Sequence, residues 1–85
     1  MGLEDRVEMI RRGYIVSYCF RDNPVNPFDC FRVSMRHDGK IIVTYGPYYH
    51  SPYDVYDSID EVKRAIRRLI EGRRVTVEVY RPLPP

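Results

Sequence analysis

The apolar side chains between Ser58 and Glu71 recur at intervals of three and four residues, which places them in one stripe along a helix. Ser58 and Glu61 have the spacing of a capping box, in which a hydroxyl and a carboxylate satisfy free amides at the start of a helix. Gly72 is suited to the left-handed conformation that ends many helices. The pattern therefore predicts an amphipathic helix from Ser58 to Glu71. Its apolar stripe consists of Ile59, Val62, Ala65, Ile66, Leu69 and Ile70.

Apolar residues also recur at helical spacing over residues 3–12, where acidic side chains come first and basic ones last, as the helix dipole favours. Gly13 ends this predicted short helix. Two other stretches alternate with a period of two, which is typical of strands. Residues 14–21 are rich in aromatic and β-branched side chains, and residues 75–80 place three valines on one face. The core face of the first predicted strand carries Tyr14, Val16, Tyr18 and Phe20.

Asp38 and Gly39 form the residue pair that tight two-residue turns prefer, so residues 31–45 are predicted to form a hairpin. If His37 lies opposite Lys40, the two strands agree on one register, since a one-residue slip would send Arg32 and Arg36 inward. The predicted core face then carries Phe31, Val33, Met35, Ile42 and Thr44, and the predicted outer face carries Arg32, Ser34, Arg36, Ile41, Val43 and Tyr45.

Prolines mark the remaining segments as irregular. Residues 22–29 contain Asn-Pro twice and are predicted to form a loop. Residues 46–57 contain two prolines and four tyrosines, which indicates an ordered loop packed over the edge of the domain. Residues 81–85 are predicted to form an extended, proline-rich tail.

The predicted order of elements is helix, strand, strand, strand, helix, strand, which belongs to the α+β class. The simplest arrangement is a four-stranded, mainly antiparallel sheet with both helices packed on one face. A chain of 85 residues has room for a single domain, which we assign to residues 1–80, followed by the tail. The helices need the sheet, because amphipathic helices this short are marginal on their own.

The composition adds a bias toward arginine: 12 Arg accompany two Lys, and the chain has no Gln and a single Ala. Many charges with few labile amides suit a thermophilic source. The formal net charge of +2 is too small to indicate a polyanionic partner by itself. No apolar run approaches the roughly 20 residues that span a bilayer, and the N-terminus lacks the layout of a secretion signal. We therefore expect a cytoplasmic protein without membrane contact.

Cys19 and Cys30 have two interpretations. Their spacing from His37 and His50 matches no zinc motif, so we expect no metal and no cofactor. The favoured interpretation is a pair of half-buried thiols in strands. The alternative is a cross-strand disulfide, because both residues flank one predicted loop, and such a bond inside the cytoplasm is typical of hyperthermophiles.

The second predicted helix and its exit carry six cations within 12 positions, and arginines in such a cluster can bind phosphate bidentately. Cations near the end of a helix are also favoured by its dipole, so a purely structural role is the alternative. Like charges four positions apart repel mildly, and an acidic partner would relieve them. The cluster consists of Lys63, Arg64, Arg67, Arg68, Arg73 and Arg74.

The predicted outer face of the sheet combines guanidinium groups with aromatic rings, a mixture that binds single-stranded nucleic acid through phosphate contacts and base stacking. We therefore hypothesise a small non-enzymatic domain that binds RNA or DNA. The alternative is a protein-interaction or homodimeric module that uses the same outer face. The residues predicted to bind nucleic acid are Arg32, Arg36, Tyr45, Arg64, Arg67, Arg68, Arg73, Arg74 and Tyr80.

A third hypothesis is a small enzyme that uses His50 in the tyrosine-rich segment. His50 lies close in sequence to Ser51 and Asp54, which are the residue types of a nucleophilic triad. No nucleophile motif such as G-x-S-x-G surrounds Ser51, and the chain has no glycine-rich phosphate loop. We therefore predict no catalytic residues.

Overall fold

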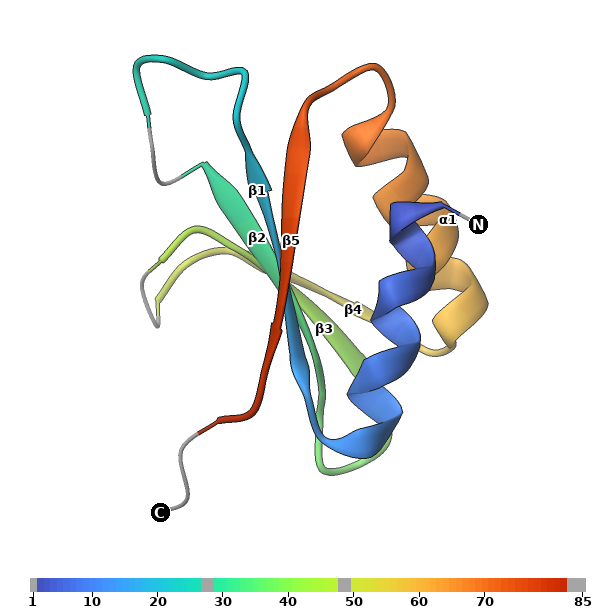
Figure 1. Ribbon diagram of the computed structural model, residues 1–85. Helices are drawn as coiled ribbons and strands as arrows, with labels where there is room; N and C mark the ends of the chain where they lie inside the picture. The colour runs from blue at the N-terminus through green and yellow to red at the C-terminus, as the bar shows by residue number, and fades with distance from the viewer. Residues whose placement is uncertain (1, 27–28, 48–49, 83–85) are drawn as a thin grey trace.

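The computed structural model describes residues 2–26, 29–47 and 50–82, which form a sheet of five antiparallel strands and two helices (Figure 1). The first helix, η1, is a 3-10 helix, and the second, α1, is an α-helix. In chain order the elements are η1 (Leu3–Arg12), β1 (Ile15–Phe20), β2 (Cys30–Met35), β3 (Ile41–Tyr45), β4 (Tyr53–Tyr56), α1 (Ile59–Ile70) and β5 (Val75–Tyr80).

The strands lie in the order β4-β3-β2-β1-β5. Both helices pack on one face of the sheet, and we name the opposite side the outer face (Figure 1). The prediction of four strands is wrong, because part of the segment predicted to be irregular forms β4. Pro47 and Pro52 precede this strand rather than interrupt it, so β4 keeps its backbone donors.

α1 begins and ends much as its sequence predicts. The Ser58 hydroxyl accepts a hydrogen bond from the Glu61 amide at 3.2 Å. The Glu61 carboxylate accepts one from the amide of Asp57, at 3.3 Å, instead of from Ser58 itself. Gly72, just beyond the helix, has a φ of 70°, which glycine adopts without steric cost. The fully or nearly buried residues of the apolar stripe are Ile59, Val62 and Ile66.

The β2–β3 hairpin has a three-residue loop rather than the predicted two-residue turn. The Arg36 amide donates to the Lys40 carbonyl at 2.7 Å, and the Gly39 amide donates to the Arg36 carbonyl at 2.9 Å. Gly39 has a φ of 88°, the left-handed conformation that completes a type I turn with a bulge. The extra loop residue shifts β3 by one position, so Ile41 instead of Ile42 points into the core.

This shift exchanges the two faces of β3. Ile41 and Val43 are each 1% exposed in the core, whereas Ile42 and Thr44 lie on the outer face. Tyr45 also points to the core side, where it contacts an aromatic ring of β2. The predicted positions of all five residues are therefore wrong, and the reason is the length of the loop.

β1 supplies the centre of the core. Val16, Tyr18 and Phe20 are buried, as the alternation predicts. The Tyr18 ring stacks on that of Phe31 with 5.0 Å between their centroids. Its hydroxyl donates to the Leu3 carbonyl at 2.9 Å, so the one polar atom of this side chain has a partner, and burial raises its pKa. Tyr18 therefore joins the sheet to η1.

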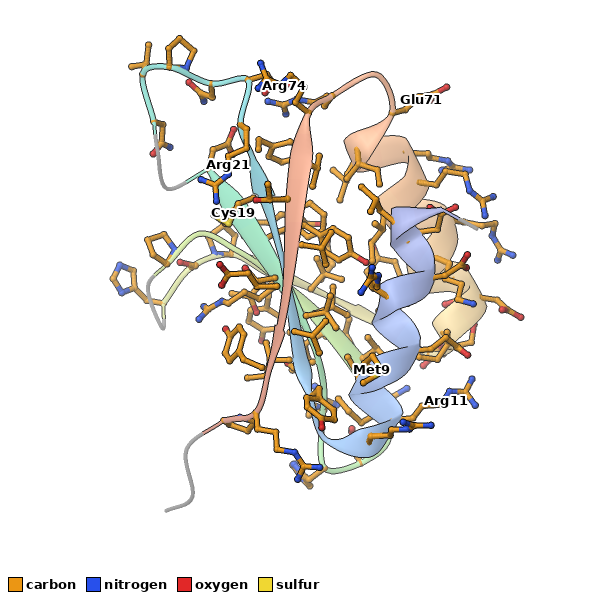
Figure 2. The ribbon with its side chains drawn as sticks, in the orientation of Figure 1. Met9, Arg11, Cys19, Arg21, Glu71 and Arg74 are labelled. Atoms are coloured by element: carbon orange, nitrogen blue, oxygen red, sulfur yellow. A yellow bond between two sulfur atoms is a disulfide. The ribbon has the colours of Figure 1, made fainter. Side chains whose placement is uncertain are left out.

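Cys19 and Cys30 form a disulfide between β1 and β2 (Figure 2). They are cross-strand partners with Cα atoms 4.1 Å apart. The alternative interpretation of the sequence is therefore confirmed, and the favoured interpretation of two separate thiols is wrong. The bond fastens the two strands at the point where they diverge into the segment from Arg21 to Asp29.

Parts of three predicted segments lie outside the described residues: 27–28 in the first loop, 48–49 in the tyrosine-rich segment and 83–85 in the tail. At the described start of the tail, the Arg81 guanidinium lies 4.7 Å from the centroid of the Tyr14 ring. Within the described parts of the chain, neither helix has the length and apolar run that a bilayer-spanning segment requires.

Candidate functional site

The basic cluster predicted on the second helix is divided between two sides of α1. Arg67 Nε donates to the Glu4 carboxylate at 2.9 Å, and Lys63 Nζ lies 3.4 Å from Asp5 and 3.7 Å from Glu8. All three acidic residues belong to η1. This side of α1 therefore holds the two helices together, and its charges are balanced within the fold.

The ion pair between Glu4 and Arg67 predicts a dependence of stability on pH. A hydrogen bond from its own backbone amide and the Arg67 guanidinium lower the pKa of Glu4. Such a carboxyl stabilises the fold above its ordinary pKa of about 4, and the stabilisation is lost as the pH falls through the lowered value. Glu4→Gln should lower the free energy of unfolding by about 1 kcal/mol at pH 7 and flatten its decline below about pH 5, measured by urea denaturation. An unchanged pH profile would contradict this role.

Arg64 and Arg68 lie on the other side of α1, one turn apart, and both are exposed. Within the described parts of the chain, neither has a carboxylate within ion-pair distance. They border a hollow of about 280 Å³ whose wall across from α1 is Tyr56, the last residue of β4. The hollow therefore combines an aromatic ring and the Glu61 side chain with two guanidinium groups that have no carboxylate partner in the described chain.

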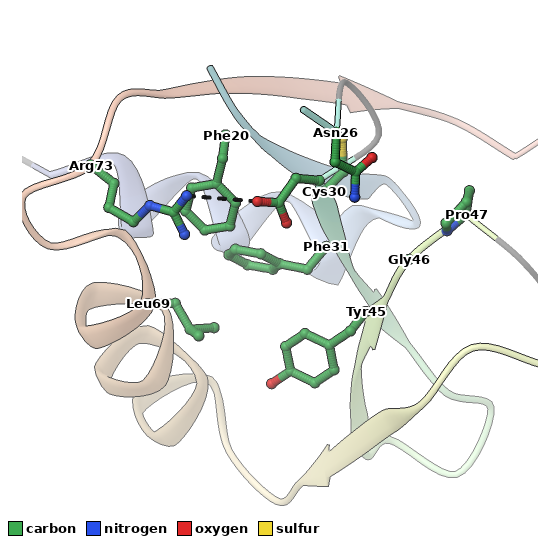
Figure 3. A pocket seen from close by; sticks show the side chains of 10 residues that line it. Phe20, Asn26, Cys30, Phe31, Tyr45, Gly46, Pro47, Leu69 and Arg73 are labelled. Carbon is green, nitrogen blue, oxygen red and sulfur yellow. Dashed lines mark ion pairs between the residues drawn. The ribbon is translucent and has the colours of Figure 1, made fainter. Parts of the chain in front are cut away.

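A larger pocket of about 530 Å³ lies between the end of α1 and the sheet (Figure 3). Aromatic rings from β1, β2 and β3 line it, and Leu69 of α1 faces them. Arg73 and Asp29 form an ion pair at its edge, with 3.6 Å between nitrogen and oxygen. Because Leu69 follows Ala65 of the smaller hollow by one helical turn, both depressions lie along the same side of α1.

Arg73 is held at the edge of this pocket by its neighbours. A terminal nitrogen lies 2.7 Å from the Asp22 carboxylate, and the guanidinium carbon lies 3.7 Å from the centroid of the Phe20 ring. This hydrogen bond lowers the pKa of Asp22. The backbone amide of the next residue, Arg74, donates to the same carboxylate, while the Arg74 side chain is exposed. Of these two predicted phosphate ligands, only Arg74 lacks a carboxylate partner in the described chain.

The sequence predicts that Tyr45 offers a stacking surface on the outer face, but the residue lies on the core side. Its ring centroid is 6.2 Å from that of Phe31, and its hydroxyl donates to the Asp54 carboxylate at 2.9 Å. Burial and this hydrogen bond raise its pKa. Tyr45 therefore lines the larger pocket and cannot meet a ligand on the outer face.

The remaining predicted residues lie apart from α1. Arg32 and Tyr80 belong to the outer face, and the Arg32 guanidinium donates to the Gly46 carbonyl at 3.4 Å. Arg36 stands at the hairpin end, where its Nε donates to Asp38 at 3.0 Å. The predicted residues thus form two separate surfaces, one along α1 and one on the outer face of the sheet.

The sequence interpretation missed two tyrosines of β4. Tyr53 is 60% exposed on the outer face, and Tyr56 borders the smaller hollow. The alternation Tyr-Asp-Val-Tyr directly after Pro52 is a strand pattern, so the signal was present in the sequence. The nearby prolines obscured it.

The three residues of the enzyme hypothesis differ in their exposure and contacts. His50 is exposed, Ser51 is 7% exposed, and the carboxylate of Asp54 accepts the Tyr45 hydroxyl. Among the residues that the structure describes, no three His, Cys, Asp or Glu side chains are grouped so that they could hold a metal ion. The hypothesis of an enzyme centred on His50 stays a prediction.

Comparison with protein-family models, with curated proteins and with solved structures finds no match for this chain. Its function is therefore inferred from the geometry of its own residues.

Proposed function

We propose that this protein binds single-stranded nucleic acid along the side of α1 that carries Arg64, Arg68 and Tyr56. The observation that supports the proposal is the smaller hollow, where two exposed arginines without ion-pair partners in the described chain line the same depression as an aromatic ring. Phosphates pair with the guanidinium groups, and a base stacks on the ring.

The charges along α1 give the bound strand a preferred position. Asp60 and Glu61 stand in the first turn of the helix, so a phosphate is repelled there. Arg64 and Arg68 stand in the second and third turns, closer to the larger aromatic pocket. The strand is therefore expected to run from the hollow toward that pocket, whose aromatic lining suits a second base.

A single strand fits this surface better than a duplex, because stacking on Tyr56 requires an exposed base face. Arg67 and Arg73 are not included among the phosphate ligands, since both are engaged by carboxylates of the same chain. Replacing either of these two would disturb the fold, so neither is a suitable probe of binding.

Fluorescence anisotropy with labelled single-stranded RNA, single-stranded DNA and duplex DNA tests the proposal. For single strands, each phosphate contact contributes about 0.7 to the slope of log affinity against log salt, so Arg64→Gln/Arg68→Gln should reduce the slope by about 1.4. The matched control is Arg6→Gln/Arg12→Gln, which removes the same charge from exposed positions of η1. No binding at about 50 mM salt, or an equal loss in both double variants, would contradict the proposal.

Variants of Tyr56 distinguish the contribution of base stacking to binding from that of the phosphate contacts. Tyr56→Leu removes the aromatic face and should weaken single-strand binding by roughly 5- to 150-fold, the effect of losing one stacked base, with no change in the salt slope. Tyr56→Phe keeps the ring and should bind nearly as well as the parent protein. Equal affinities of the leucine and phenylalanine variants would exclude stacking on this residue.

The outer face of the sheet offers a second candidate function, a protein-binding or homodimeric module. Tyr53 and Val55 of β4 are 60% and 41% exposed on this face, and Tyr80 is 38% exposed near its other edge. Such apolar exposure is typical of a contact surface. Binding through this face should persist at high salt, whereas phosphate contacts weaken, so the salt dependence distinguishes the two functions.

A further inference from the structure

β5 forms one edge of the sheet and has β1 as its only neighbour among the described strands. It is the frontmost strand in Figure 1, and no segment is drawn over its free edge. A six-residue strand with one unpaired side is a template for pairing with another chain.

The backbone groups at this free edge can be identified. The Arg21 amide donates to the Arg74 carbonyl at 2.8 Å, which makes these two residues a hydrogen-bonded pair in the ladder between β1 and β5. Hydrogen-bonded and non-hydrogen-bonded pairs alternate in an antiparallel ladder. The amides and carbonyls of Val75, Val77 and Val79 therefore point away from β1, toward solvent.

The side chains of β5 indicate that this edge lacks cover. Its three valines lie on the core face but are only half-buried. The valines in the middle of the sheet, by contrast, are fully or almost fully buried: Val16, Val33 and Val43 are 0–1% exposed. An added strand would therefore bury apolar surface on the core face as well as satisfy the free backbone groups.

We propose that β5 pairs antiparallel with β5 of a second copy of this chain, about a two-fold axis at Thr76. In this register Val75 lies opposite Val77 of the second copy, so outward-pointing backbone groups meet. On the outer face, Arg74 lies opposite Glu78 of the second copy, and the two-fold axis repeats this ion pair. The two sheets of five strands then form one continuous sheet.

Charge complementarity is the reason for choosing a second copy as the partner. Arg74 and Glu78 are both exposed and have no ion-pair partner in the described chain. They stand two residues before and two residues after Thr76, so the strand is complementary to itself. An axis at Val77 would place Glu78 opposite Thr76, without an ion pair, and an axis at Glu78 would bring two carboxylates together.

The other edge of the sheet is less suited to this pairing. β4 has four residues, and Pro52 precedes it directly, so it offers a shorter run of free backbone groups. Pairing of β5 with itself also closes after two copies, because a two-fold contact uses the same edge of both chains.

A charge exchange tests the proposal in sedimentation equilibrium or light scattering over a range of protein concentrations. Arg74→Glu and Glu78→Arg, each alone, turn two attractions into two repulsions and should weaken dimerisation about tenfold or more. The double variant Arg74→Glu/Glu78→Arg keeps the net charge and should restore the affinity to within about threefold of the parent. Arg12→Glu, with the same charge change on η1, is the control and should leave it unchanged.

Val77→Pro provides a second, independent variant. Its amide points to the free edge, so proline removes one donor from each chain of the dimer and no bond of the ladder with β1. This variant should be monomeric with an unchanged circular dichroism spectrum. A parent protein that stays monomeric at every concentration would overturn the proposal, and so would a dimer that none of these variants weakens, which would indicate contact through the outer face.

Discussion

Replacing Ile41 by alanine is expected to lower the free energy of unfolding by about 2–5 kcal/mol, whereas the same change at Ile42 is expected to cost only about 1 kcal/mol. Ile41 is 1% exposed and belongs to the core, so its removal leaves a cavity. Ile42 lies on the outer face and is half-buried, so solvent fills the space that its side chain leaves.

The comparison is well matched because both residues are isoleucines at adjacent positions of β3. Differences in strand propensity between isoleucine and alanine therefore largely cancel. Urea denaturation followed by circular dichroism measures both variants, and an unchanged slope with urea confirms two-state unfolding of a similar surface. A larger loss for Ile42→Ala would support a two-residue turn and contradict the three-residue loop.

This prediction depends on the hairpin register, for which the sequence predicts a two-residue turn and the structure shows a three-residue loop. Asp38-Gly39 suits both a two-residue turn and a three-residue loop that ends with glycine in the left-handed conformation. The turn residues alone cannot choose between them. The choice is made by burial, since the observed register places Ile41, Val43 and Tyr45 toward the core, a more apolar set than Ile42 and Thr44.

Local sequence signals were enough to predict α1 but not β4. The cap, apolar stripe and terminal glycine of α1 are neighbours in sequence, and each acts over one or two helical turns. β4 is a four-residue edge strand whose formation depends on pairing with β3. Strand formation of this kind depends on tertiary contacts. The sequence pattern alone, with two nearby prolines and a weak alternation, therefore predicted an irregular segment instead of a strand.

In the candidate site, too, local sequence signals predict some features, whereas others depend on contacts between distant parts of the chain. That α1 would present a basic surface could be read from its sequence, but the partners of each arginine could not. Arg67 pairs with Glu4, 63 residues away, and Arg73 pairs with Asp22, 51 residues away. Arg64 and Arg68 are distinguished from Arg67 only by the packing of α1 on η1, which turns one side of the helix toward acidic residues and the other toward Tyr56.

A second large effect is expected from the disulfide between Cys19 and Cys30. The bond joins residues 11 positions apart, and closing a loop of this length reduces the entropy of the unfolded chain. Its loss in the double variant Cys19→Ala/Cys30→Ala should lower the free energy of unfolding by about 3 kcal/mol. For a domain of 85 residues this is a large share of the total stability, because so small a chain buries a limited core.

Urea denaturation of the parent protein with and without dithiothreitol measures the effect directly. Reduction by the dithiol should bring the parent close to the double alanine variant, and the variant itself should not respond to the reductant. Alkylation under denaturing, non-reducing conditions followed by mass spectrometry counts the free thiols as an independent control. Two free thiols in the air-oxidised protein, or equal stability of parent and variant, would contradict the prediction.

The position of the disulfide determines which part of the fold should open most readily when the bond is lost. The Phe20 amide donates to the Asp29 carbonyl at 2.9 Å, just beyond the bond and beside the larger pocket. Without the disulfide, the ends of β1 and β2 are held there by backbone hydrogen bonds and the packing of Phe20 and Phe31. Hydrogen exchange of the Phe20 amide should therefore accelerate more than that of buried α1 amides such as Ile66, because opening this end requires separating only two strands. Uniform acceleration would instead indicate that the bond stabilises the fold globally, through the unfolded chain alone.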